Sequence, residues 1–214
     1  MSAPVSCCHF TALAVVAFMI HAAGCATQSR PLVSIPVPPV VSTSEWGSSA
    51  STTDTARRHK ITHITLHHGG VTFDPDRNVP DYLRGLQRWS RIEKGWIDVP
   101  YHFIIDLKGR IYEGRSIDFA GDTNTEYDPT GHALIEVIGN YELIEPTASQ
   151  RQSIIQLMSW LAAKYDVPVA NIAAHRDYSA QTVCPGKNLY RYLQDGAFQS
   201  AVRQNLVAAG KSGI

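Results

Sequence analysis

The stretch Ala174–Gly186, AHRDYSAQTVCPG, brings a histidine and a cysteine together within a few residues. Thr182 lies two residues before Cys184, and a Pro-Gly turn follows the cysteine directly. A catalytic zinc site uses three nitrogen, sulfur or oxygen ligands and keeps one position open for water. His175 and Cys184 are therefore predicted to be two of the three protein ligands of one Zn²⁺ ion, and the third has to come from another part of the chain.

Segments that resemble strands and helices alternate around this stretch, which predicts an α/β fold. We expect a single domain over residues 58–214, with a central mixed β-sheet flanked by helices and the zinc site at strand ends. The expected strands are residues 59–68, a hairpin within 99–115 that turns at Leu107–Gly109, residues 131–142, and VANIAAH (169–175), which ends in His175. The expected helices are Asp81–Ile92, a helix that begins with a capping box at Thr147 and Gln150 and ends before Pro168, and a terminal helix over Leu189–Val207.

Two histidines, His67 and His68, are candidates for the third ligand. They end the β-branched run HKITHITLHH, so either one would lie at the end of a strand. Alternation along the strand groups His67 with Thr65 and His68 with Leu66, on opposite faces of the sheet. If helices cover both faces, alternation does not decide between the two histidines, and both stay open on this ground.

Two other kinds of site, the kinase catalytic loop and the blue copper site, use similar residues. A His-Arg-Asp sequence also occurs in kinase catalytic loops, but this chain has no glycine-rich phosphate loop and no following Asp-Phe-Gly. Two histidines and one cysteine also suit a blue copper site, which usually has an axial methionine. The methionine outside the signal region, Met158, is expected in the core of a helix, so zinc is the better prediction.

The beginning of the chain has the character of an export signal. The apolar run from Phe10 to Ala23 is short for a membrane span, and the small residues Ala22, Ala23 and Gly24 precede Cys25. This resembles the processing box of bacterial lipoproteins, although Ala22 replaces a larger aliphatic residue and no Lys or Arg precedes the run. We predict a signal peptide over residues 1–24 and lipidation of Cys25, which would anchor the protein at the outer membrane, facing the periplasm of a Gram-negative bacterium. The alternative is ordinary secretion with cleavage nearby.

Residues 25–57 are rich in Pro, Ser and Thr and have no sustained period, which predicts an extended tether rather than a packed element. An exported, acylated protein would keep Cys184 as a lone thiol in an oxidising compartment, where a lone thiol needs a reason. Lys+Arg and Asp+Glu each total 19, so the formal net charge is zero. A neutral chain is a poor partner for nucleic acid, which we exclude.

Four segments, in this order and spacing, carry a family resemblance: ITLHHGG, DVPYHFIIDLKGRIYEGR, IEVIGNYE and AAHRDYSAQTVCPG. Together they resemble the type 2 N-acetylmuramoyl-L-alanine amidases, a group shared by phage endolysins, bacterial amidases and peptidoglycan recognition proteins. The resemblance covers the whole chain after the tether. It implies the peptidoglycan recognition protein fold and a zinc hydrolase that cleaves the bond between the lactyl group of N-acetylmuramic acid and the L-alanine of the stem peptide.

The resemblance also implies roles for individual residues. It places the zinc on His67, His175 and Cys184, because the family ligand is the histidine directly after the apolar strand. Glu136 matches a carboxylate that some bacterial members use as a general base, a role that suits a carboxylate inside an otherwise apolar strand. Tyr101 matches the catalytic tyrosine of the family, and Thr182 matches a position held by Lys or Thr in active members. Both hydroxyls could donate to the developing oxyanion.

Further residues are expected around this centre. Asp177 should have a turn or supporting role beside His175. The sequence HHGG has glycines where relatives often have Thr-Ala or Ser, which leaves the local substrate contacts open. Substrate contacts are expected at four positions, with the fixing of a turn as the alternative for the last three: His68, His102, Arg115 and Asn140.

The predicted partner is peptidoglycan or a muropeptide, the predicted cofactor is one Zn²⁺ ion, and the predicted state is a monomer attached to the membrane only through its lipid. Two alternatives stay open. One is a peptidoglycan-binding module without catalysis, against which Cys184 argues because binding-only relatives typically lack this cysteine. The other is a secreted lysin directed at other cells, against which an acylated Cys25 would argue.

Overall fold

The computed structural model describes residues 1, 34–50 and 56–211 of the chain. The predicted signal peptide, Cys25 and the first part of the predicted tether lie outside the described residues, apart from residue 1. The signal peptide and the acylation of Cys25 therefore stay predictions. Among the helices of the described residues, none has the length and apolar character needed to cross a bilayer.

Six strands form one mixed sheet in the order β1-β4-β3-β5-β2-β6. Neighbouring strands run parallel, except β3 and β4, which form the antiparallel hairpin expected around Leu107–Gly109. The mixed sheet and the α/β class are thus as the sequence predicts. The strands are β1 (Val40–Val41), β2 (His63–His68), β3 (Phe103–Ile105), β4 (Ile111–Glu113), β5 (His132–Val137) and β6 (Ile172–Ala174).

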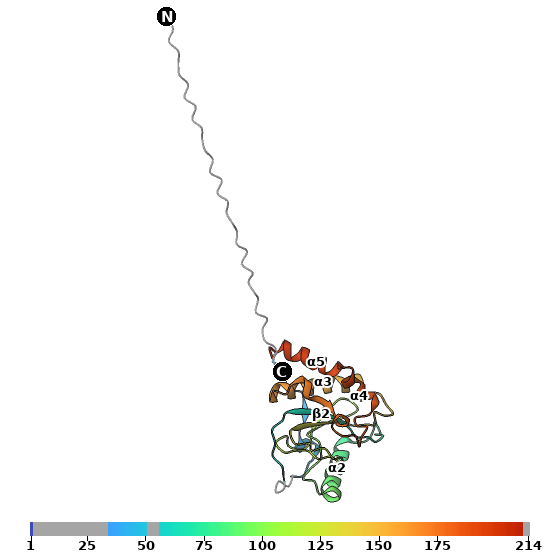
Figure 1. Cartoon of the computed structure of the whole chain (residues 1–214). Coiled ribbons are helices and arrows are strands. Elements are labelled where there is room, and N and C mark those ends of the chain that lie inside the picture. Colours follow the sequence, from blue (N-terminus) through green and yellow to red (C-terminus); the bar gives the residue numbers. More distant parts are fainter. Residues whose placement is uncertain (2–33, 51–55, 212–214) are drawn as a thin grey trace. The chain divides into compact units, whose positions relative to one another are not determined.

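Helices cover both faces of the sheet. One core cluster joins Ile64 and Leu66 of β2 to the apolar sides of α3, α4 and α5. A second cluster, on the other face, joins Ile104 of β3 to α1 and α2, and Figure 1 shows α2 on the side of the sheet away from α3 and α5. The helices are α1 (Thr43–Trp46), α2 (Val79–Lys94), α3 (Ala148–Tyr165), α4 (Lys187–Gln194) and α5 (Ala197–Ala208), with short 3-10 turns at Val169–Asn171 and His175–Asp177.

Two helix predictions have different outcomes. The capping box of α3 is confirmed, because Thr147 Oγ1 accepts the N–H of Gln150 at 3.1 Å and Gln150 Oε1 accepts the N–H of Thr147 at 3.0 Å. The single terminal helix predicted over Leu189–Val207 is wrong. Gly196 adopts the left-handed conformation, with φ of 76°, and divides this region into α4 and α5. The apolar pattern continues through the break, so periodicity did not reveal it.

The prediction of an extended tether up to residue 57 is wrong for the segment from β1 to α1. β1 pairs with β4, and Trp46 at the end of α1 is 1% exposed. The Trp46 indole donates to the carbonyl of Glu113 at 2.7 Å. Burial of a tryptophan together with its hydrogen bond fixes this segment on the sheet.

The sheet also decides where the predicted ligands lie. Ile64 and Leu66 face the core under α3, so His67 faces the opposite side, toward α2. His67 is the register partner of Glu136 on β5, so these two side chains lie side by side. Leu66 pairs with Ala174 on β6, and His175 follows directly. The carboxyl ends of β2, β5 and β6 therefore bring residues from three distant segments together at one end of the sheet.

Candidate metal centre and cleft

His67, His175 and Cys184 form one buried group whose ligand atoms all lie within 4.8 Å of one another. The Cys184 Sγ is 3.7 Å from His67 Nδ1. In a tetrahedral site with Zn–N near 2.0–2.1 Å and Zn–S near 2.3 Å, a nitrogen and a sulfur ligand stand about 3.6 Å apart. The separation in this chain is that of two atoms able to share a zinc ion. The donor set of two imidazoles and one thiol suits zinc as well.

Buried polar atoms without partners also mark this place as a binding site. Within the described residues, His67 Nε2 and Glu136 Oε2 are buried and have no hydrogen-bond partner. Such atoms are rare in folded proteins and usually meet water, an ion or a ligand. The residues present therefore fit a metal centre that opens onto a cleft.

Burial prepares the imidazoles to act as ligands. It lowers the pKa of His175 to about 4 and, together with the neighbouring His175, holds the pKa of His67 well below its ordinary value. Both rings are therefore neutral at pH 7, which is the form that binds a metal. Burial raises the pKa of the Cys184 thiol to about 12, so without a cation this group keeps its proton. A bound zinc ion would reverse this, because a coordinating thiol loses its proton.

The structure distinguishes His67 from His68. His68 Nδ1 accepts the backbone N–H of Tyr141 at 3.3 Å, and the backbone N–H of His68 donates to Cys184 Sγ at 3.3 Å. His67 is the member of the metal group, and His68 lines the cleft beside it. His67 therefore belongs to the group that could hold a metal ion, and the roles of His67 as ligand and of His68 as substrate contact stay predictions.

Glu136 lies at the base of the cleft in a buried position. Burial raises the pKa of this carboxyl to about 7, and Tyr82 of α2 donates to its Oε1 at 3.2 Å. A side chain at Gly69 would place a Cβ only 2.9 Å from the same oxygen. The first glycine of HHGG therefore lets the backbone pass close to the carboxyl, which gives a physical reason for this departure from the family pattern.

An open cleft of about 540 Å³ runs past the metal group. Tyr101 lines it, with its ring centroid 5.3 Å from that of His67. Burial holds the pKa of Tyr101 well above its ordinary value, so its hydroxyl keeps a proton to donate. Thr182 also lines the cleft, and its Oγ1 accepts the N–H of Cys184 at 3.1 Å, which leaves the hydroxyl hydrogen for another acceptor.

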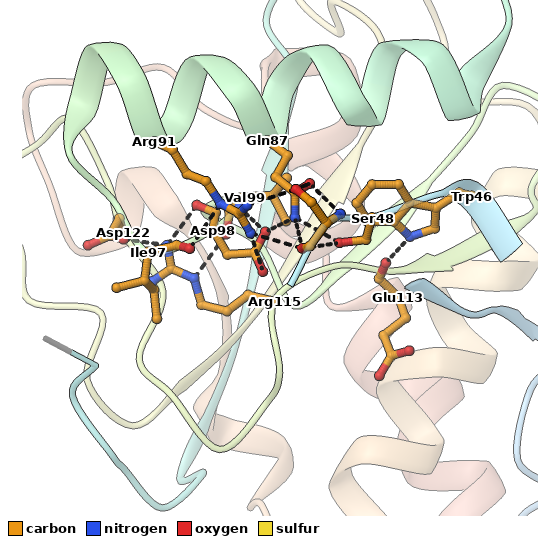
Figure 2. Close-up of polar contacts among 11 residues, drawn as sticks. Trp46, Ser48, Gln87, Arg91, Ile97, Asp98, Val99, Glu113, Arg115 and Asp122 are labelled. Carbon is orange, nitrogen blue, oxygen red and sulfur yellow. Dashed lines mark hydrogen bonds and ion pairs between the residues drawn. The ribbon is translucent and has the colours of Figure 1, made fainter. Parts of the chain in front are cut away.

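Helix α2 forms one wall of the cleft through Leu86 and Trp89. Figure 2 shows polar contacts that Gln87 of the same helix makes with neighbouring segments. Gln87, which is 3% exposed, donates to Ser48 Oγ and to Asp98 Oδ1, each at 2.7 Å. The segment after α1 is thereby joined to α2 and to the loop that leads to Tyr101.

Three predicted substrate contacts are corrected by the structure, because these residues do not line the cleft. His102 uses both ring nitrogens internally: Nε2 lies 2.9 Å from the Phe119 carbonyl, and Nδ1 accepts the N–H of Leu134 at 2.9 Å. Arg115 is 2% exposed, and its guanidinium donates to three backbone carbonyls. Asn140 fixes a turn, with Oδ1 accepting the N–H of Glu142 at 3.1 Å.

Asp177 has the turn role that was expected beside His175. Its Oδ2 accepts the N–H of Ala174 at 2.8 Å, and its Oδ1 accepts the hydroxyl of Tyr190 at 2.7 Å. Three contacts were missed from the sequence: Tyr82 on Glu136, and Thr123 and Thr125 on the His175 ring. The two threonines lie in an aperiodic loop, and no sequence signal marks them.

Fold and site together define a single-domain α/β protein with a candidate metal centre at the strand ends, open to a cleft. The chain belongs to the N-acetylmuramoyl-L-alanine amidase family, because the family model with this description matches residues 57–187.

Known relatives agree with this assignment. The chain is 30% identical over 160 residues to peptidoglycan recognition protein 1 of Bos indicus. The aligned region covers 72% of this chain and 82% of that protein. It is similar in structure to the endolysin N-acetylmuramoyl-L-alanine amidase LysCS of Clostridium intestinale, with a TM-score of 0.59, 26% identity and coverage of 77% of this chain and 97% of that chain. The Drosophila peptidoglycan recognition protein SD, at 24% identity, shares the fold with a TM-score of 0.65 over 73% of this chain and 93% of that one.

Proposed function

We propose that this protein is a zinc-dependent N-acetylmuramoyl-L-alanine amidase that cleaves the lactyl–L-alanine amide bond of peptidoglycan or muropeptides. The observation that carries the proposal is the group of His67, His175 and Cys184, which could hold a metal ion and lies beside the buried carboxyl of Glu136 in an open cleft. The family and the similarity to an endolysin amidase support the same reaction. A role in cell-wall turnover or recycling follows from that substrate.

Zinc held by the three ligands would supply a water nucleophile near neutral pH and polarise the scissile carbonyl. Glu136, the register partner of His67, accepts a proton from the attacking water and passes it to the leaving amine of L-alanine. The partnerless Oε2 is the oxygen available for this transfer, because Tyr82 already donates to Oε1. The hydroxyl of Tyr101 donates to the oxyanion that develops on the carbonyl, and Thr182, which also lines the cleft, can add a second donor.

The test is digestion of purified sacculi and defined muropeptides with the full chain, with and without a strong chelator, followed by identification of the products by mass. We expect free lactyl-sugar strands and peptides that begin with L-alanine, and no such products in chelator or from Cys184→Ser. Products cut at another bond, or full activity in chelator, would contradict the proposal. Tight binding of muropeptide without any product would instead support the binding module named above.

We further propose that the protein is exported and anchored by an acylated Cys25. The small residues before Cys25 support this reading. Within the described residues Cys184 is a free thiol, and a bound metal would protect it in an oxidising compartment. Metabolic labelling with a fatty acid should mark the wild type and not Cys25→Ala. Equal labelling of both, or release of the wild type into the medium, would favour a secreted lysin.

A further inference from the structure

The imidazole of His175 is held by two threonines that the proposed mechanism does not use. Thr125 Oγ1 lies 2.7 Å from His175 Nε2, and Thr123 Oγ1 lies 3.2 Å from the same nitrogen. The two hydroxyl oxygens are 3.0 Å apart, and the backbone N–H of Thr125 donates to Thr123 Oγ1 at 3.2 Å. The nitrogen thus meets a short chain of hydroxyls rather than the carboxylate or carbonyl that metal-binding histidines commonly use.

This arrangement selects one tautomer of a metal-bound ring. When one ring nitrogen binds a metal, the other carries the proton and has to donate it. Thr125 occupies Nε2, so Nδ1 is the nitrogen left for the metal group. Nε2–H can donate to Thr125 Oγ1, and the Thr125 hydroxyl can in turn donate to Thr123 Oγ1. The hydrogens on Nε2 and on the Thr125 hydroxyl then each have an acceptor.

Contacts on both sides of Thr125 keep this loop in place. On one side Arg115 donates to the Ala120 carbonyl at 2.6 Å and pairs with the carboxylate of Asp122. Figure 2 shows this pairing and the contacts of Arg115 with the segment that contains Asp98 and Val99. On the other side Ser179 Oγ donates to the carboxylate of Glu126 at 2.6 Å. The buried Arg115, predicted to contact substrate, thus anchors the loop that reaches His175.

We propose that Thr125 is a positioning residue for the metal ligand His175, and that its hydroxyl fixes the orientation and tautomer of the ring and so sets the zinc affinity of the site. The inference rests on the proposed zinc site. Removing a hydrogen-bond partner of this kind typically weakens metal binding about 10- to 100-fold. A valine in place of Thr125 has nearly the same shape and leaves Nε2 facing a methyl group.

The test measures zinc affinity in the full chain by competition with a chromophoric chelator. Thr125→Val should bind zinc about 10- to 100-fold more weakly than the wild type, and Thr125→Ser should recover to within about threefold. The matched control is Thr62→Val. Thr62 Oγ1 lies 2.8 Å from Nδ1 of His63, which is outside the metal group, so losing this similar contact should leave zinc affinity unchanged.

A second measurement reports on geometry rather than on affinity alone. The visible absorption of the cobalt-substituted protein should change in Thr125→Val and return in Thr125→Ser. Thermal unfolding of the metal-free variants shows whether each one folds, and Thr125→Ala replaces the valine variant if valine does not fit.

Two results would overturn the inference: zinc affinity of Thr125→Val within about threefold of the wild type, or an equal loss in Thr62→Val. These outcomes are separate from failure of the proposed function. A wild type that binds zinc but releases no L-alanine peptides would refute the proposed amidase activity. The zinc affinities of the Thr125 variants would still decide the role of Thr125. An active wild type together with unchanged zinc affinity in Thr125→Val would support the amidase activity and refute the role of Thr125.

Discussion

Replacement of Glu136 by glutamine should separate the function of this carboxyl from its effect on stability. Burial raises its pKa from 4.5 to about 7. The folded protein therefore favours the protonated form more than the unfolded chain does. The stabilisation is complete below pH 4.5 and is lost as the pH rises through 7. Integrated between pH 5 and 8, this loss amounts to about 2 to 3 kcal/mol in the free energy of unfolding.

The measurement is urea unfolding of the metal-free wild type and of Glu136→Gln at several pH values in this range. The difference between the two proteins isolates the carboxyl, because His67, His175 and the other buried groups titrate in both. Glutamine can still accept the hydrogen bond from Tyr82. We expect the wild type to lose about 2 to 3 kcal/mol relative to the variant between pH 5 and 8.

The same variant should lose catalysis. A general base typically contributes about 10²- to 10⁴-fold, so kcat/KM on a soluble muropeptide should fall by that factor, with the zinc content unchanged. A difference in stability that does not vary with pH would show that Glu136 is already ionised in the folded protein. A variant that keeps more than about a tenth of the wild-type kcat/KM would refute its role as the base.

Three further substitutions test other parts of the site and fold. Cys184→Ser should abolish tight zinc binding. In the wild type the thiol has a pKa of about 12 and loses its proton when zinc binds, so zinc affinity should rise about tenfold per pH unit from pH 6 to 8. Competition with a chelator measures both effects. Gly69→Ala, whose Cβ would lie 2.9 Å from Glu136 Oε1, should lower kcat/KM at full zinc content, whereas Gly85→Ala, with nothing within 4 Å, should not. Trp46→Ala should cost about 3 to 5 kcal/mol of unfolding free energy in urea, and a cost under about 1 kcal/mol would mean that the segment from β1 to α1 is not part of the folded core.

The sequence predicted β2 to β6 and most helices, because periodicity and capping residues are local signals, but it did not predict β1. The choice between His67 and His68 shows where such signals end. Both histidines lie on one strand, and alternation assigns them to opposite faces without saying which face holds the cleft. That answer comes from the packing of α3 under Ile64 and Leu66, which is a property of the whole fold.

The wrong predictions of substrate contacts at Arg115 and His102 have one physical cause. Arg115 and His102 look like substrate ligands because they are polar, yet both are buried and use their nitrogens on backbone carbonyls and amides that the sequence does not reveal. The tether was misjudged by composition. A local signal was present there, since Ser42 and Glu45 form a capping box that begins α1 and leads to Trp46.

The pairing of β1 with β4 has a consequence for where the chain can be shortened. β1 occupies the outer side of β4, at the border of the sheet. A shortened form that starts at residue 57, where the family match begins, would leave backbone amides and carbonyls of β4 unpaired and a cavity in place of the Trp46 side chain. Unpaired edge strands of this kind pair with strands of other molecules, so that form would self-associate and precipitate even though it retains His67, His175 and Cys184.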